Sequence, residues 1–475
     1  MNMVPSITSI FTGRIKLRIK GNDIKNELED CYIMIEAFQL IKKQLSSSSD
    51  MKKELIRIQD IELEILYMDS VCDEKKIKAD LIFPILECSG KEEFKDYLTS
   101  LPDINKPEKD QDILQKLMIG HACIQMENEL FLFNAKKVIN NQLGDASSET
   151  AIYGSQRSFS DVMDTNLNLI RHRYPSPNLV YEKSKVSGVP QTEIGIIYDS
   201  LLVDKGVLSE LQTEIASVKP EVILSAAHLQ RLLTTRKYSL FPILMITERP
   251  DRVALNLKQG KIVILVEGSP FVLIAPATFF DFISSMDDTF EQLWVSFSLV
   301  VLRYISIFIT VLLPGIYISL VSFNPELFQS QLAFSIAGSR SGIPYPSYIE
   351  VLIMMFLIDT LIEASIRLPK SISAAATTVG GLILGQAAQQ ANLVSNIMII
   401  VTSAIGIANF VVPINAMSFA LRIVKYPFIL LASLFGYVGL IAGLFCLILY
   451  LNDLKSFGKP YLKVFIGEQE NFGKL

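Results

Sequence analysis

Long apolar runs dominate the chain after residue 290, whereas shorter apolar runs alternate with polar segments before it. Helix-start signals and polar breaks divide the apolar part into five helical segments. We predict these segments at residues 288–321, 347–367, 371–388, 393–421 and 427–451. The second segment carries acidic residues and is marginal as a span that faces lipid.

The distribution of basic residues predicts the orientation of these segments only in part. If the polar half is cytoplasmic, Arg367 and Lys370 fall in one cytoplasmic loop, and Arg422 and Lys425 in another. Five crossings, however, would place the lysines of residues 455–463 on the opposite side, against the positive-inside rule. A re-entrant or interfacial segment would remove this conflict, and the sequence leaves the side of the C-terminus open.

The polar half contains a diverged internal repeat. Residues 63–73 resemble residues 194–204, and residues 120–131 parallel residues 260–271 at an offset of 140. The first pair predicts a strand that enters an acidic turn, and the second pair predicts a β-hairpin. Chance similarity between hydrophobic strands is the alternative. We therefore expect two similar α/β subdomains that could pack on each other, joined by a polar linker with a helix near residues 159–171.

The expected fold class is an α/β soluble N-terminal half followed by an all-α polytopic membrane domain of about five hydrophobic helical segments. The predicted divisions are a first cytoplasmic α/β subdomain (1–140), a linker with a helix (141–184), a second cytoplasmic α/β subdomain (185–286), the membrane domain (287–452) and a polar tail (453–475).

Composition agrees with a polar half joined to a membrane half. The chain is 50% hydrophobic, with a mean hydropathy of +0.36 and a net charge of −5. The last 185 residues hold ten Lys or Arg and eight Asp or Glu, against 34 and 41 in the first 290. This balance excludes a basic nucleic-acid surface. Five cysteines without a CxxC pair, and no secretory signal pattern, suit a reducing compartment.

The sequence carries no enzyme motif that we can identify. It has no phosphate-binding Gly-rich loop, no GxSxG and no HExxH, and its three histidines lack metal-ligand spacing. We therefore expect a protein that is not an enzyme and that holds neither a cofactor nor a metal.

Acidic residues within the apolar half are the candidate functional groups. Asp359 and Glu363 lie four residues apart and share a helix face, whereas Glu350 projects roughly oppositely. An ionised side chain that faces lipid costs about 2.5–3.5 kcal/mol or more, so this helix should face protein or water. One interpretation is an ion path whose carboxylates attract cations.

Structural roles are the alternative for the same residues. Glu350 could close a capping box with Ser347. Asp359 and Glu363 could pair with Arg303, the interior charge of the preceding helix, and Glu363 could pair with Arg367. Both interpretations can hold together, because a pore helix also needs anchoring.

Several motifs resemble spore germination receptor A subunits, the GerA family. The clearest are Glu248-Arg249-Pro250-Asp251 after Thr247, and the hairpin that ends in Glu267-Gly-Ser-Pro270. Further similarity covers residues 336–346, which include Arg340, and residues 363–369, which include Arg367. Glu267 departs from the Asp that is common in the family. The resemblance spans about residues 145–450.

The resemblance implies a multi-pass subunit of a nutrient-responsive receptor in the spore inner membrane, with its large N-terminal half in the cytoplasm. Expected partners are a nutrient-binding B subunit, a C-subunit lipoprotein, membrane lipid and further copies of the chain in a homo-oligomer. The resemblance suggests that this oligomer is a ring around a gated ion path. The motif residues Glu248, Arg249, Pro250, Asp251, Arg340 and Arg367 would belong to a gating interface. The alternatives are a non-conducting scaffold and signal transducer for the B subunit, and nutrient binding by the soluble subdomains themselves.

Overall fold

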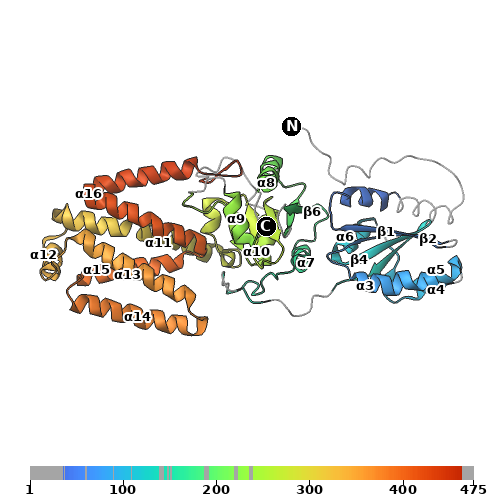
Figure 1. The fold of residues 1–475 in the computed structure, drawn as a ribbon, viewed down its shortest axis with the longest axis horizontal. Helices are drawn as coiled ribbons and strands as arrows, with labels where there is room; N and C mark the ends of the chain where they lie inside the picture. The colour runs from blue at the N-terminus through green and yellow to red at the C-terminus, as the bar shows by residue number, and fades with distance from the viewer. Residues whose placement is uncertain are drawn as a thin grey trace. The chain divides into compact units, whose positions relative to one another are not determined.

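A computed structural model describes residues 36, 38–58, 61–88, 90–107, 110–137, 144–146, 149, 152–186, 192–218, 223–234 and 239–462. The chain divides into two compact units, Met1–Val138 and Ile139–Leu475 (Figure 1). An α/β fold forms the first unit and the start of the second, and the rest of the second unit is helical.

The first unit is a five-stranded antiparallel sheet packed with helices. Its strand order is β1 (Met51–Ile58), β2 (Ile61–Met68), β4 (His121–Met126), β5 (Glu129–Asn134) and β3 (Ile104–Asn105). Its helices are α3 (Glu74–Ile77), α4 (Phe83–Glu87), α5 (Lys91–Ser100) and α6 (Asp110–Ile119), with a π-helical turn at Lys78–Ile82. Leu63 and Ile65 alternate with glutamates along β2 and are fully buried, so period-two patterning sets the core face.

The second unit begins with a sheet of the same topology. Its order is β6 (Leu179–Val186), β7 (Thr192–Asp199), β9 (Ile262–Val266), β10 (Val272–Ala275) and β8 (Met245–Thr247). Numbered along each subdomain, both sheets have the order 1-2-4-5-3, as the 140-residue repeat predicts. The edge strand β6 begins inside the predicted linker, whose helix is α7 (Met163–Arg173).

Helices cover both faces of this second sheet. Side chains of α7 and α10 (Pro250–Lys258) share one hydrophobic core with the sheet. Those of α8 (Lys205–Ser217) and α9 (Ala226–Leu233) share the other. The central strand β9, with the sequence Ile-Val-Ile-Leu-Val, is buried at every position because both of its faces are covered.

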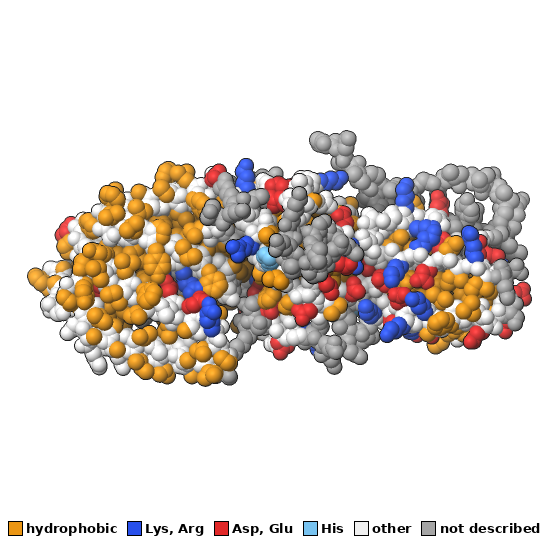
Figure 2. Space-filling model, in the orientation of Figure 1, with side chains coloured by type: hydrophobic (Ala, Val, Ile, Leu, Met, Phe, Trp, Pro, Cys, Tyr) orange, Lys and Arg blue, Asp and Glu red, His pale blue; other side chains and the backbone are white. Residues whose placement is uncertain are grey.

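The helical part of the second unit contains six helices. They are α11 (Leu293–Ser322), α12 (Ser330–Arg340), α13 (Ser347–Arg367), α14 (Lys370–Gln390), α15 (Asn396–Val411) and α16 (Asn415–Asp453). Among the described residues, α11 and α16 are long and apolar enough to cross a membrane, and α15 is apolar but shorter. Hydrophobic side chains cover most of the visible surface of this part (Figure 2).

The last two helices differ from the predicted ones. The break lies at residues 412–414, where Pro413 follows α15, and Pro427 is accommodated inside α16. The prediction that Arg422 and Lys425 lie in a loop is therefore wrong, because both belong to the first arm of α16. This helix folds back at Gly436, whose φ is +60°, into two arms.

Close packing holds the two arms of α16 together. A Cβ on Gly439 would lie 2.1 Å from the carbonyl oxygen of Leu431, and a Cβ on Gly443 would lie 2.9 Å from the Leu431 side chain. Only glycine permits this approach between backbones. The fold at Gly436 adds one helical passage to those predicted, so α16 returns toward the sheet (Figure 1).

The residues after α16 attach to the second sheet. Residues 454–461, which we call the C-terminal strap, include the short hairpin of β11 (Lys455–Ser456) and β12 (Lys459–Pro460). The Ser456 hydroxyl donates to the carbonyl of Ile243 at 2.7 Å and accepts from the amide of Ala277 at 3.1 Å. The sequence left the side of Lys455 and Lys459 open, and in the structure both lie at the sheet end of the bundle.

Candidate functional site: charged clusters in the helical bundle and at its junction with the sheet

Four charged residues form a buried cluster where the second sheet meets the helical bundle. We call Glu149, Arg249, Asp251 and Arg252 the junction cluster. Arg249 precedes α10, and Pro250 occupies the first helical position, where its missing N–H costs nothing. The Arg249 guanidinium donates to both carboxylate oxygens of Asp251, at 3.0 and 2.5 Å. Arg252 Nε donates to Glu149 Oε2 at 2.8 Å.

These pairs have electrostatic consequences. Burial raises the pKa of the Asp251 carboxyl, but the Arg249 guanidinium, the Arg252 amide and the charge of Arg173 together lower it by more, so this pKa lies below its usual value. Glu149 Oε1 is buried and has no hydrogen-bond partner among the described residues. A cavity of about 290 Å³ separates the cluster from Val412, Pro413 and Asn415, so the cluster faces the loop between α15 and α16.

Arg303 fastens the start of α11 to the same region. Its guanidinium makes a two-pronged ion pair with Asp288, including a contact from Nη2 to Oδ1 of 2.9 Å. Asp288 also closes a capping box with Ser285 on the 3-10 turn Met286–Thr289. One alternative drawn from the sequence paired Arg303 with Asp359 or Glu363 of α13. That pair does not form, because an acid nearer in the chain binds Arg303, whereas the other alternative, Glu363 with Arg367, does form.

The far end of the bundle, away from the sheet, holds a second cluster. We call Tyr317, Arg340, Glu350 and Ser395 the far-end cluster. Glu350 is fully buried, and its Oε1 accepts from both the amide and the hydroxyl of Ser395, each at 2.6 Å. Tyr317 donates to Oε2 at 3.3 Å, and Arg340 Nε lies 3.4 Å from the same oxygen. Glu350 thereby joins α11, α13 and α15 to the end of α12.

The predicted capping box at Ser347 and Glu350 does not form. Pro346 occupies the N-cap of α13, and Ser347 contacts Ser322 instead. Ser395 is the residue that caps a helix here, because its hydroxyl accepts from the Met398 amide at the start of α15.

A groove between α13 and α16 is lined by further charges of the bundle. This α13–α16 groove has a volume of about 700 Å³. Asp359 accepts from Lys425 Nζ at 2.8 Å and from the Tyr426 hydroxyl at 2.5 Å. Lys425 is almost fully buried. Glu363 and Arg367 form an exposed pair at 2.8 Å on the same wall.

Comparison with known proteins identifies the family. The model of "Bacillus/Clostridium GerA spore germination protein" matches residues 39–473. The chain belongs to the GerA family. It is 35% identical to spore germination protein B1 of Bacillus subtilis, over 89% of each chain. It is 32% identical to spore germination protein KA of the same organism, over 89% of this chain and 79% of that protein. The resemblance drawn from the motifs is confirmed.

One solved structure is also similar to this GerA-family chain. The crystal structure of the N-terminal domain of the A subunit of the Bacillus megaterium spore germinant receptor GerK3 shares 24% identity with it. That match covers 51% of this chain and 94% of the solved chain, with a TM-score of 0.40.

The structure brings only part of the predicted ion-path set together in this GerA chain. Asp359 and Glu363 line one groove, whereas Glu350 lies nine residues earlier, about 13.5 Å along the helix axis and on another face. The motif residues are also separated. Arg249 and Asp251 belong to the junction cluster, Arg340 to the far-end cluster, and Arg367 to the groove.

Sequence reasoning missed the basic partner of Asp359. Lys425 and Arg422 end a long charge-free stretch, so they resembled loop residues that follow a span. Their spacing of three places them on one side of a helix, and this spacing was the available signal. Ser395 and Tyr317 carried no signal in sequence, because their roles depend on contacts between helices.

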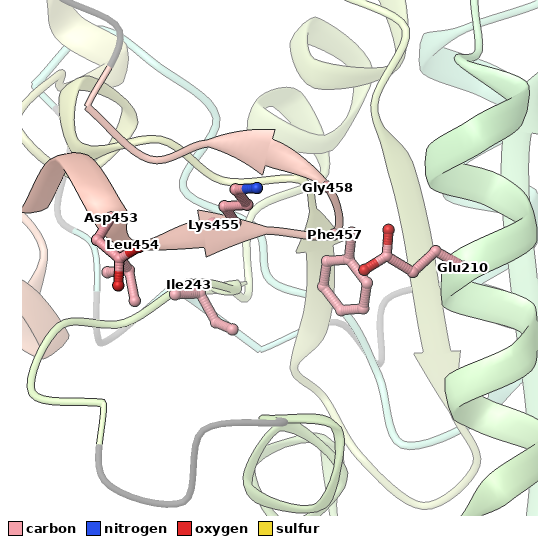
Figure 3. Close-up of a pocket in the computed structure, with 7 residues that line it drawn as sticks. All are labelled: Glu210, Ile243, Asp453, Leu454, Lys455, Phe457 and Gly458. Carbon is pink, nitrogen blue, oxygen red and sulfur yellow. The ribbon is translucent and has the colours of Figure 1, made fainter.

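The C-terminal strap borders a further cavity. This cavity, of about 410 Å³, lies between α8 and the strap, with Glu210 on one side and Lys455, Phe457 and Gly458 on the other (Figure 3). Phe457 is buried in the core that α8 and α9 share with the sheet. Among the described residues, no group of three or more His, Cys, Asp or Glu is arranged to hold a metal.

Proposed function

We propose that this chain is the A subunit of a nutrient-responsive spore germination receptor in the spore inner membrane. Membership of the GerA family and the names of the relatives support the role in germination. Its partners would be the B and C subunits of the receptor and further copies of itself. The apolar helices would place the bundle in the membrane and both α/β subdomains in the cytoplasm.

The proposed topology has an even number of passages through the membrane. The passages are α11, α13, α14, α15 and the two arms of α16, with α12 as a short helix at the far end. The attachment of the C-terminal strap to the second sheet supports an even number. This topology also places Lys455 and Lys459 on the cytoplasmic side, in agreement with the positive-inside rule.

In the proposed mechanism, assembled copies form a gated ion path along α13. The observation that carries this proposal is the Asp359–Lys425 pair, in which Lys425 is almost fully buried and the partly buried Asp359 borders an open groove. Charges at such a depth are costly and mark ion pathways in many membrane proteins. Asp359 and Glu363 would present carboxylates to the path. Glu350 would hold the helices at the far end.

The junction cluster would transmit the state of the soluble part to this path. The loop at residues 412–415 leads directly into the first arm of α16, which carries Lys425. A movement of α10 against this loop would therefore displace the base that neutralises Asp359. The Arg303–Asp288 pair would hold the start of α11 at the sheet, and the C-terminal strap would hold the end of α16 there.

A variant of Asp359 tests this function. Spores that carry Asp359→Asn should release ions more slowly after nutrient addition, at an unchanged protein level. Glu326→Gln, which removes an exposed acid from the 3-10 turn Pro325–Leu327, is the matched control and should release ions like the wild type. Wild-type release from Asp359→Asn spores would contradict the ion path.

The second candidate function is a non-conducting scaffold for the B subunit. Its support is that Glu350, Asp359 and Glu363 all have cationic partners within one chain, so each has a structural role available. On this account, Asp359→Leu combined with Lys425→Met would leave ion release intact, because an apolar replacement of both partners can preserve packing.

A further inference from the structure

The α13–α16 groove, taken together with Lys425 buried beside it, carries one more positive charge than its two carboxylates neutralise. Lys425 pairs with Asp359, and Arg367 pairs with Glu363. The remaining base is Arg422, which lines the same groove. Among the described residues that form the groove, this leaves one guanidinium without an acid.

Arg422 is held in place, but its guanidinium lacks part of its hydrogen bonding. The residue is 9% exposed, and its guanidinium lies 4.4 Å from the centre of the Phe419 ring. Its Nε is buried and has no hydrogen-bond partner among the described residues. Both carboxylates of the groove are paired with other bases, so the positive charge of this guanidinium at the groove wall favours an anionic ligand.

The rest of the groove is suited to hydrocarbon. Phe356, Ala364, Phe419 and Ile423 contribute apolar walls. A single cation beside such walls matches a molecule with one anionic group and a long apolar portion. A free anion would fill the charged corner but leave the apolar walls exposed.

We propose that the α13–α16 groove binds an anionic phospholipid, with its phosphate at Arg422 and an acyl chain along the apolar walls. Arg422 lies seven residues after the start of α16, or about 10 Å along its axis. Side chains on a helix lean toward its N-terminus, which here is the sheet end of the bundle. The guanidinium therefore reaches toward the headgroups of the leaflet nearest the sheet, where basic pockets between helices recognise anionic lipids.

This inference requires that the bundle lies in a membrane, but it does not require ion conduction. If the groove also lines the ion path, lipid and ions would occupy it in alternate states. Lipid binding is therefore measured on the purified chain without any assay of ion flux.

The test uses native mass spectrometry of the full-length chain in detergent, with phosphatidylglycerol and phosphatidylcholine of identical acyl chains in equal amounts. We expect preferential retention of phosphatidylglycerol, and a loss of about tenfold in that preference in Arg422→Gln, as for one charge-assisted contact. Lys459→Gln is the control, because it removes one positive charge at the same end of the chain but outside the groove.

Further measurements identify what occupies the α13–α16 groove. Thr360→Trp keeps every charge but fills the groove, and it should reduce retention of both lipids. Inorganic phosphate in millimolar excess should leave the preference unchanged. The proposal is wrong if Arg422→Gln retains the wild-type preference, or if inorganic phosphate displaces the lipid. It is also wrong if Ile423→Cys forms a disulfide between copies in intact membranes, because a second chain would then cover the groove.

Discussion

Replacement of Glu350 by alanine is the substitution whose effect the structure determines best. It would leave the amide and hydroxyl of Ser395 without their acceptor in a buried environment, and the Tyr317 hydroxyl would keep only its contact with the Ser395 hydroxyl. Each unsatisfied donor costs about 1–3 kcal/mol. Arg340 keeps contact with solvent, and the hydroxyls can rotate toward other acceptors. We therefore expect a total loss of about 3–4 kcal/mol.

Thermal unfolding of the purified full-length chain in detergent measures this loss. For a bundle of this size, each kcal/mol lowers the midpoint by about 2–4 °C, so Glu350→Ala should unfold about 6–16 °C earlier. Glu350→Gln keeps one acceptor oxygen and should lose less. Glu363→Ala, on the same helix but in an exposed pair, should unfold close to the wild type. Equal midpoints for Glu350→Ala and the wild type would refute the anchoring role.

Three further predictions follow from local geometry. Gly439→Ala should destabilise the fold of α16, because its Cβ would meet the Leu431 carbonyl, whereas Gly406→Ala in open space should unfold at or above the wild-type midpoint. Tyr461→Phe should unfold like the wild type, because the buried hydroxyl of Tyr461 has no partner among the described residues, but Tyr461→Ala should lose about 3–5 kcal/mol. The lowered pKa of Asp251 contributes stability that is complete above its unfolded pKa of about 3.9 and disappears as pH falls through the folded pKa. The protection of the α10 amides from hydrogen exchange, measured relative to the intrinsic exchange rate at each pH, should therefore fall at acid pH in the wild type, and Asp251→Asn should show reduced protection even at neutral pH.

Patterning predicted the parts of the fold that depend on local periodicity. The hairpins at residues 120–131 and 260–271 stand out because they repeat, and both sheets share one strand order. Apolar runs likewise marked α11 and α13. Chain reversal at Gly436 was not predictable from periodicity, because apolar residues continue on both sides of a glycine whose role is set by contacts between the two arms.

The candidate site was predictable only as a set of residue types. Charges in an apolar half identified Asp359 and Glu363, because burial of an unpaired acid is costly. Their partners depended on which helices pack together. Arg303 found an acid fifteen residues before it, and Asp359 found a base 66 residues after it. Sequence separation alone could not rank these alternatives.

Ion flux through the purified chain in liposomes tests the central claim most directly. Liposomes loaded with potassium, and carrying the chain together with its partner subunits, should release potassium when nutrient is added. Asp359→Asn should reduce that release, whereas Glu326→Gln should not. If wild-type liposomes, with all subunits present, release no more potassium than protein-free liposomes, the chain does not form an ion path.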